Sequence, residues 1–427
     1  MSARPAYQLT PEQLAIQAER KRKKDEAKFK PKPAPSAQTA SWNLLAQTLV
    51  RRELFPTSDC LKQSQRDPMT FAELLVHNAD ILCLQEVDRL DKILPILNAA
   101  GYSHTYTAGP RKLHGCMIVH RESHFEKIGE RSVLYDSVAF GELQDGSPRA
   151  GIGRVTKNVG LVVALRDKFD ARRGCLVATT HLFWHPSYVY ERVRQSTILL
   201  REVTSLRAEL GYTSWPCFVI GDFNFPPTDA TYALMVGSQW STEQESSVSK
   251  SRVVHVSIDP TVDSGVAPED DDEGGGGQAE GNKETDPDRI IVNCRAPRDT
   301  DGLLKLDELL AMAPRLGLRS AYDEALRSVL HGNAEATLPI SVFHERENGP
   351  PSQSLGAFEP MFTSYTHYWK ATLDYLFMLD GDDGDRRVQP QAVRVLAPLT
   401  REAMEPGLPK LGICASDHVS LAADIVF

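Results

Sequence analysis

The sequence predicts an α/β fold: a four-layer α/β/β/α sandwich in which two sheets pack together and helices cover their outer faces. Short apolar runs bounded by Gly, Asp or Asn recur along the chain, as is typical of buried strands. Longer segments with helical spacing of apolar residues lie between several of these runs, so strands alternate with helices. The chain has 427 residues, a length that one large sandwich domain can occupy.

Start and stop signals place the elements of the first half of the chain. A helix is expected from Asp67-Pro68, where Asp can act as the cap, to about Asn78. Further helices are expected at 90–100 and 188–210, closed by Gly101 and Gly211. Strands are expected at 81–84, 102–107, 115–119, 160–165 and 175–180.

The second half begins with the apolar run 217–220, which stops at Gly221 and Asp222 and is typical of a buried strand. Residues 241–300 are rich in Ser, Gly and acidic residues, so we expect most of this stretch to be a disordered surface insertion. Two short helices and three strands then complete the sandwich. They are expected at 307–312 and 321–330, and at 373–378, 388–396 and 419–426.

The N-terminal residues 1–36 are expected to form a basic tail ahead of the main domain at 37–427. Thr10 and Pro11 predict the start of a helix, and the Lys/Pro-rich segment 28–35 predicts its end. A basic run of this kind is usually a solvated face. Contact with RNA and a nuclear address are the alternatives.

The charge, the cysteines and the length of the apolar runs limit the classes of protein to which this chain can belong. The formal net charge is −9, but nine acidic residues and one lysine lie between Glu269 and Asp288, so the rest of the chain is close to neutral. A nucleic-acid cleft is compatible with that distribution, although no chain-wide basic field supports it. The seven cysteines form no CxxC pair, so we expect reduced core thiols rather than zinc or disulfides. Without an apolar run of membrane length or a signal core, we expect a soluble protein of the cytoplasm or nucleus.

One candidate site follows the run 217–220, where Asp222 and Asn224 end an apolar strand. On an extended chain, residues two apart point to the same face, so these two side chains are expected to lie side by side. An anion beside a neutral amide suits metal-assisted attack on a phosphate. The alternative is a simple turn, because Gly, Asp and Asn all favour turns.

Glu86 is a second candidate, because it follows the buried run 81–85 and places a carboxylate at the end of a strand. Magnesium prefers oxygen ligands and often binds only one or two protein carboxylates. Glu86 together with Asn43 would suffice for such a site. The alternative is an ordinary surface Glu after a strand.

The run Ser416-Asp417-His418 is the most specific pattern in the chain. An imidazole beside a carboxylate can take up or stabilise charge at a phosphate when another carboxylate fixes its orientation. Asp374, which precedes Tyr375 in a later apolar run, is a candidate for that carboxylate. A lone His before an apolar strand would more often be structural.

Taken together, six short motifs resemble those of the endonuclease/exonuclease/phosphatase superfamily, which has a DNase I-like fold. They are Ser41-Trp42-Asn43, Leu84-Gln85-Glu86-Val87, Thr180-His181-Leu182, Gly221-Asp222-Phe223-Asn224, Leu373-Asp374-Tyr375 and Ser416-Asp417-His418. Within that superfamily, the chain from about Ser41 to Phe427 is similar to the CCR4-type RNA exonucleases, and especially to the fungal NGL-type enzymes. The resemblance implies metal ligands Asn43 and Glu86; catalytic residues His181, Asp222, Asn224, Asp374, Asp417 and His418; and substrate contacts Asn158, Pro186 and Trp369.

The resemblance also implies an activity. We expect hydrolysis of single-stranded RNA from its 3′ end with Mg²⁺, or alternatively Mn²⁺, releasing 5′-mononucleotides and with an adenosine preference as a hypothesis. Pro186 and Trp369 would sandwich a base, and stacking on Trp tolerates different bases. The alternatives are a 2′-phosphodiesterase or 2′-phosphatase that acts on a small adenine-containing molecule, and a non-catalytic RNA-binding protein. No leucine-rich repeat precedes the domain, so we expect no docking of the kind CCR4 uses, and a monomer.

One segment departs from the family pattern. Several apolar residues normally precede the Asn of the first motif, whereas Pro35-Ser36-Ala37-Gln38-Thr39-Ala40 stands before Ser41 here. This predicts either a short, weak first strand or a version of the chain that lacks residues, and it weakens the expected placing of Asn43.

Overall fold

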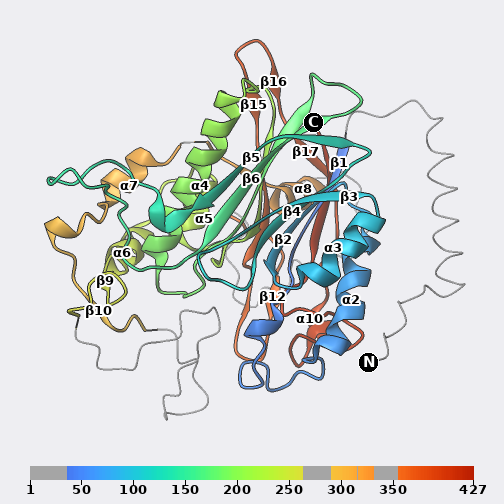
Figure 1. The fold of residues 1–427 in the computed structure, drawn as a ribbon, viewed down its shortest axis with the longest axis horizontal. Helices are drawn as coiled ribbons and strands as arrows, with labels where there is room; N and C mark the ends of the chain where they lie inside the picture. The colour runs from blue at the N-terminus through green and yellow to red at the C-terminus, as the bar shows by residue number, and fades with distance from the viewer. Residues whose placement is uncertain (1–35, 263–289, 315, 331–353) are drawn as a thin grey trace, which may run out of the picture.

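The computed structural model describes residues 36–262, 290–314, 316–330 and 354–427. Two six-stranded sheets pack face to face, and helices cover the outer face of each (Figure 1). The predicted four-layer α/β/β/α sandwich is therefore confirmed. The predicted N-terminal helix after Thr10 lies outside the described residues, so the division into a tail and a main domain stays a prediction.

The first sheet carries the N-terminal strands together with the last strand of the chain. Its order is β17 (Gln391–Val395), β18 (Leu421–Val426), β1 (Ser36–Asn43), β2 (Ile81–Val87), β4 (Gly115–Arg121) and β3 (Tyr102–Ala108). β1 pairs in parallel with β2, which sets Asn43 opposite Gln85. Three helices pack on the outer face of this sheet: α2 (Gln63–Val76), α3 (Leu90–Ala99) and α10 (Arg401–Met404).

The second sheet has the order β11 (Arg319–Ser320), β14 (Asp374–Leu379), β8 (Cys217–Asp222), β7 (Gly174–His181), β6 (Val159–Asp167) and β5 (Phe125–Leu134). β7 and β8 are parallel, with His181 opposite Asp222. β14 runs antiparallel to β8, so its first residue, Asp374, is also opposite Asp222. Strand ends from three parts of the sequence thus meet at one end of this sheet.

Helices also cover the second sheet and its flank. α4 (Val189–Glu209) and α5 (Ala230–Met235) pack on the outer face, and α6 (Thr242–Lys250) and α7 (Leu306–Met312) pack on α4. α8 (Ala321–Leu330) contacts β14 and β17 at the margin of the two sheets. The remaining elements are short: β9 (Val254–His255), β10 (Cys294–Arg295), β12 (Ser364–Tyr365), β13 (Lys370–Ala371), β15 (Gly381–Asp382), β16 (Arg387–Val388), η1 (Gln47–Leu49), η2 (Tyr135–Ser137) and η3 (Asp299–Asp301).

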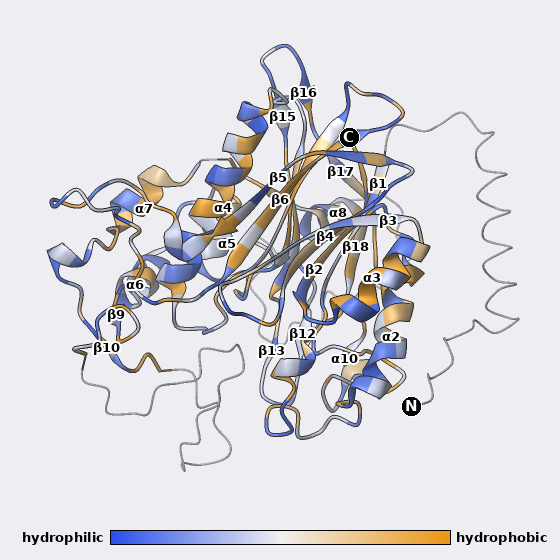
Figure 2. Cartoon of the chain, in the orientation of Figure 1, coloured by the Kyte–Doolittle hydropathy of each residue, from blue (hydrophilic) through white to orange (hydrophobic). Residues whose placement is uncertain are grey.

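The main core lies between the two sheets. Ile81, Ile118, Val177, Ile220 and Leu376 are buried there, and hydrophobic residues gather on the strands of both sheets (Figure 2). Because both faces of the central strands are covered, β2 and β8 are apolar almost throughout rather than alternating. All seven cysteines are free and six are buried, as predicted for core thiols.

The expectation of a short, weak first strand is wrong, while the alternative, a version of the chain that lacks residues, stays a hypothesis. β1 has eight residues and pairs along its length with β18 on one side and β2 on the other. Its polar residues are accommodated by hydrogen bonds, since the buried Thr39 hydroxyl donates to the Ala423 carbonyl at 3.2 Å. Pairing on both edges satisfies the backbone, so this strand needs fewer apolar residues than the usual pattern.

Two other expectations need correction. The expected disorder across 241–300 is wrong for the described part of that stretch. There α6 is capped by Ser241 and buries Val248 against α4, and β9 pairs with β10. Residues 263–289 lie outside the described chain.

The start of α2 also differs from the prediction. α2 begins at Gln63 rather than at Asp67, with Pro68 inside it, because Gln65 and Lys62 form the cap. β5 was not predicted, since its exposed outer positions interrupt the apolar pattern.

Helix α4 carries a buried ion pair beneath the second sheet. Glu191 Oε2 accepts from Arg194 Nε at 2.9 Å, and Arg194 Nη1 donates to the Tyr135 carbonyl at 3.0 Å. Both side chains are fully buried, and burial raises the pKa of Glu191 despite the nearby guanidinium. The pair holds the loop before β6 to α4, because Gly153 N donates to Glu191 Oε1 at 2.6 Å.

We expect Arg194→Met to lower the free energy of unfolding by about 3–5 kcal/mol, because it leaves a buried carboxylate without its cation. Chemical denaturation of purified protein measures this. Arg172→Met is the control, since Arg172 pairs with Asp170 in solvent and should change stability little. Equal losses in the two variants would contradict the prediction.

Candidate active site

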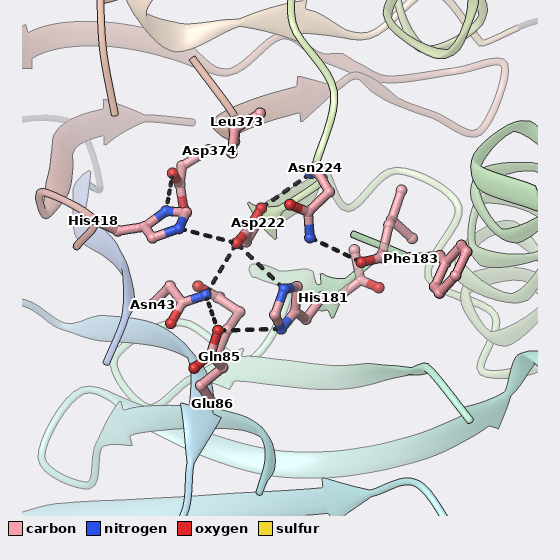
Figure 3. Close-up of polar contacts among 12 residues, drawn as sticks. Asn43, Gln85, Glu86, His181, Phe183, Asp222, Asn224, Leu373, Asp374 and His418 are labelled. Carbon is pink, nitrogen blue, oxygen red and sulfur yellow. Dashed lines mark hydrogen bonds and ion pairs between the residues drawn. The ribbon is translucent and has the colours of Figure 1, made fainter. Parts of the chain in front are cut away.

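Polar side chains converge where β1, β2, β7 and β8 end and β14 begins (Figure 3). Asn43 and Glu86 come from the first sheet, and His181, Asp222 and Asp374 come from the second. His418 lies just before β18 and forms a bridge with Ser364. The cluster therefore lies between the two sheets, at the ends of their strands. Strand ends position side chains more rigidly than a free loop would.

Asp222 is at the centre of the cluster. Its Oδ2 lies 3.0 Å from Asn43 Nδ2, 3.4 Å from His181 Nε2 and 3.6 Å from His418 Nε2. Only 1% of the residue is exposed. One carboxylate oxygen thus faces an amide and two imidazoles that come from different parts of the chain.

Asp374 orients His418. His418 Nδ1 lies 2.7 Å from Asp374 Oδ2, which leaves Nε2 facing Asp222. Asp374 is held in turn by Thr363, whose hydroxyl accepts from the Asp374 amide at 3.0 Å. The carboxylate therefore fixes which ring nitrogen faces the centre of the site.

The cluster shifts the pKa values of its members. Burial lowers the pKa of His418, but the carboxylates of Asp374, Asp222 and Asp417 outweigh it and hold the pKa well above its ordinary value. Burial and the Asp374 charge raise the pKa of Asp222, opposed by His418, His181 and the Asn43 hydrogen bond. The arrangement thus favours an imidazolium beside a carboxylate of increased basicity.

Glu86 occupies a bulge at the end of β2. The register with β4 shifts between Leu84 and Val87, and Glu86 has φ 54, which is unusual for a residue with a side chain. Its Oε1 accepts from Asn43 Nδ2 at 2.8 Å and its Oε2 accepts from Ala46 N at 2.8 Å. Bulges of this kind re-aim a side chain, and backbone strain of this kind clusters at functional sites.

The donor set fits a hard divalent cation. Glu86 and Asp222 are two buried carboxylates that share the amide nitrogen of Asn43. Oxygen donors of this kind suit Mg²⁺ or Mn²⁺. Asn43 Oδ1 accepts from Leu45 N at 3.0 Å, so this amide would have to rotate to present its oxygen to an ion. Atoms of Asp222, Asp374 and His418 also lie within 4.8 Å of one another, but His418 Nδ1 is engaged with Asp374, so this trio is better described as an orienting pair beside a carboxylate.

The expectation that Asp222 and Asn224 share one face of an extended strand is wrong. β8 ends at Asp222, and Asn224 has φ 53 in the left-handed region. Its backbone N donates to Asp222 Oδ1 at 3.0 Å and its Nδ2 donates to the Leu182 carbonyl at 2.9 Å. Asn224 thus braces the loop after His181 while staying next to Asp222, because Asn tolerates this backbone region.

The other predicted residues lie around the cluster. Asn158 is buried and donates from Nδ2 to the His181 carbonyl at 2.9 Å. Asp417 is buried, and its Oδ1 lies 3.3 Å from the Ser416 hydroxyl. Pro186 is exposed, and its carbonyl accepts from Arg192 Nη2 at 2.7 Å. Trp369 is half-buried, edge-on to Phe55 with ring centroids 6.4 Å apart.

Gln85 was not assigned a role from the sequence. It is fully buried, and its Nε2 donates to the Thr179 hydroxyl of the opposite sheet at 2.9 Å. This contact joins β2 to β7 directly below Glu86 and His181. The signal was a carboxamide inside an otherwise apolar strand, since a buried amide needs a hydrogen-bond partner.

The sequence profile of the endonuclease/exonuclease/phosphatase family matches residues 40–418. The chain belongs to this family. Its site is accordingly that of a hydrolase of phosphate esters, with the nuclease and phosphodiesterase classes represented among its relatives.

Curated relatives support the same assignment. The chain is 29% identical over 90% of its length, and 75% of the relative, to a Schizosaccharomyces pombe protein named as a probable RNA exonuclease. It is 27% identical to RNA exonuclease NGL2 of Saccharomyces cerevisiae over 90% of this chain and 77% of that one. Human 2′,5′-phosphodiesterase 12 is 27% identical over 49% of this chain and 37% of its own.

Among solved structures, ANGEL2, described as a 2′,3′-cyclic phosphatase, superposes with a TM-score of 0.56 at 21% identity and covers 92% of this chain and 96% of its own. At that identity the match supports the fold alone. The DNase I-like fold is thus confirmed by the family and by the two packed sheets. None of the described helices is long and apolar enough to span a bilayer.

Proposed function

We propose that this protein is a divalent-metal-dependent RNA exonuclease that degrades single-stranded RNA from its 3′ end and releases 5′-mononucleotides. The convergence of Asn43, His181 and His418 on one oxygen of Asp222 carries this proposal. The two fungal relatives named as RNA exonucleases, matched over 90% of the chain, favour RNA as the substrate. A monomer in the cytoplasm or nucleus, and a preference for 3′-terminal adenosines, belong to the same proposal.

The residues around Asp222 would act on a phosphodiester as follows. Asp222 orients a water and takes its proton, for which its raised pKa is suited. His418, held by Asp374, donates from Nε2 to the phosphoryl oxygens as negative charge develops. His181 and Asn224 border the same phosphate, and Asp417 supports the charge of His418.

The proposed metal ligands are Glu86 and Asn43, with Mg²⁺ the first choice and Mn²⁺ the second. When bound, the cation supplies positive charge that offsets the charge of the phosphate. The Glu86 carboxylate is oriented by hydrogen bonds from Asn43 Nδ2 and from the backbone N of Ala46. Asn158, Pro186 and Trp369 are the proposed substrate contacts, with a base between Pro186 and Trp369.

The test of this function is digestion of one RNA that is labelled at its 3′ or its 5′ end. We expect labelled mononucleotide at once from the 3′ label, and a ladder of shortening products from the 5′ label. EDTA should abolish both and added Mg²⁺ should restore them. Release of mononucleotide from the 5′ label first would overturn the direction. No cleavage of any RNA, with RNA still bound, would favour the non-catalytic alternative.

A second candidate is a 2′-phosphodiesterase or 2′-phosphatase that acts on a small adenine-containing molecule. The match to human 2′,5′-phosphodiesterase 12 over half of this chain favours it. Rates on 2′,5′-linked oligoadenylate and on 3′,5′-linked oligoadenylate of equal length separate the two candidates. Faster cleavage of the 2′,5′ linkage would remove ordinary RNA as the proposed substrate. Equal rates on oligo(A) and on mixed-sequence RNA would remove the proposed adenosine preference.

The raised pKa of His418 predicts a pH dependence. The charged imidazolium persists below the folded-state pKa, so activity should hold above the ordinary value of about 6.5 and fall only in the alkaline range. Asp374→Asn removes the carboxylate that raises this pKa most, and leaves burial, which lowers it, opposed only by Asp222 and Asp417. The alkaline fall should therefore move to lower pH in a kcat profile of this variant. An unchanged profile would contradict the assigned pair.

A further inference from the structure

Arg66 lies in α2, behind the cluster, and is fully buried. Its Nε donates to the Ala415 carbonyl and its Nη2 to the carbonyls of Leu44 and Leu45. Its Nη1 donates to Gln47 Oε1 at 2.9 Å. One side chain thus joins the loop that follows Asn43 to the loop that precedes His418.

One of the loops that Arg66 joins has a strained backbone conformation. Leu45 has φ 53, a backbone region that a branched side chain rarely adopts, and its carbonyl is one of those that Arg66 binds. The Ser416 hydroxyl donates to the Asn43 carbonyl at 2.6 Å and accepts from His418 N at 3.1 Å. Trp42 Nε1 donates to the His418 carbonyl at 2.8 Å. These contacts place Asn43 and His418 in one hydrogen-bonded unit.

From these contacts we infer that Arg66 is a positioning residue, which sets the distance between the Asn43 and Glu86 side of the site and the His418 side. This inference rests on the proposed function. Arginine suits the role because its planar fork donates to several carbonyls at once, which a lysine ammonium does not reproduce. Burial lowers the pKa of Arg66 to about 10, so the side chain stays cationic at neutral pH.

Arg121 offers a matched control. It is also buried, and its Nη2 donates to the carbonyls of Asn78 and Ala79 and to the Tyr102 hydroxyl. It closes the turn before β2, at the opposite end of that strand and roughly 20 Å from Glu86 by the usual rise of a strand. Arg66→Lys and Arg121→Lys therefore remove the same kind of contact, near the site and far from it.

The experiment measures kcat, KM and the His418 Nδ1 proton resonance in both variants. The resonance is assigned by its loss in His418→Ala. We expect Arg66→Lys to lower kcat by roughly tenfold to a hundredfold, with KM nearly unchanged, and to shift or broaden the resonance. Arg121→Lys should keep kcat and the resonance even if both variants lose the same thermal stability.

Gln47→Met is the second variant, should Arg66→Lys fold poorly. It keeps Arg66 and removes the acceptor of Arg66 Nη1, together with the hydrogen bond from Gln47 Nε2 to the Leu61 carbonyl. We expect a smaller fall in kcat with the same change of the resonance. Normal kcat and an unmoved resonance in both variants would overturn the inference, as would an equal fall in kcat for Arg121→Lys. If the wild-type chain cleaves no RNA, the proposed function fails, while the resonance still decides the role of Arg66.

Discussion

His418→Ala should lower kcat on RNA by about 10³-fold or more while the protein stays folded. The substitution removes the imidazole whose Nε2 faces Asp222 and whose charge is maintained by Asp374. KM should change little, because the lost contact would strengthen only as charge develops on the phosphate. Single-turnover rates with 3′-labelled RNA, at saturating Mg²⁺, measure the effect.

Two further variants test whether the loss in His418→Ala is specific to this imidazole and to its pairing with Asp374. His104→Ala removes a half-buried imidazole on β3, at the edge of the first sheet, and should leave kcat unchanged. Asp374→Asn combined with His418→Ala should be only slightly slower than His418→Ala alone, because Asp374 acts mainly through the imidazole and otherwise only through its charge on Asp222. Additive losses, or a His418→Ala enzyme with ordinary activity, would rule out the orienting pair.

Glu86→Gln should lower kcat/KM by about 10²-fold or more at fixed Mg²⁺, because it removes the charge of the proposed metal ligand. The side chain keeps its size, but one of its oxygens becomes an amide that faces either Asn43 or the Ala46 backbone. Higher Mg²⁺ should recover part of the rate. Calorimetric titration of the free protein with Mg²⁺ provides a second measurement that does not depend on turnover.

The control for Glu86 is Glu126→Gln, since Glu126 pairs with Arg166 at the exposed start of β5. That variant should bind Mg²⁺ and cleave RNA as the wild type does. Undiminished Mg²⁺ binding by Glu86→Gln would show that the ion is held elsewhere. Asp222→Asn, in which metal affinity and water activation change together, separates these roles less well.

His418 and Arg66 belong to two successive layers of one site. His418 would touch the substrate, whereas Arg66 contacts backbone carbonyls behind it. Ser416 and Trp42 join Asn43 to His418, but these bonds do not hold the loop after Asn43 against the loop before His418, which strand ends alone leave free to move apart. A buried guanidinium that binds both loops removes that freedom, and such supports commonly decide whether a complete set of groups is well placed.

The sequence by itself determined most of the elements and predicted the candidate residues of the site. Apolar runs predicted β2, β7 and β8, and polar residues at their ends identified Glu86, His181 and Asp222. These patterns are local, because a buried strand must be apolar wherever it occurs and its functional groups can stand only where it ends. The same pattern, a polar residue beside an apolar run, predicted Asp374 and His418 as candidates.

Only the tertiary structure decided how these groups meet. It showed that residues 36–43 form a strand paired on both sides, turned Asn224 out of the extended strand and gave Gln85 a partner on the opposite sheet. It also brought Arg66 to Ala415, 349 residues along the chain. Hydrogen bonds between distant segments depend on how the sheets pack, and neither partner carries a local pattern that identifies the other, so no reading of neighbouring residues could have supplied them.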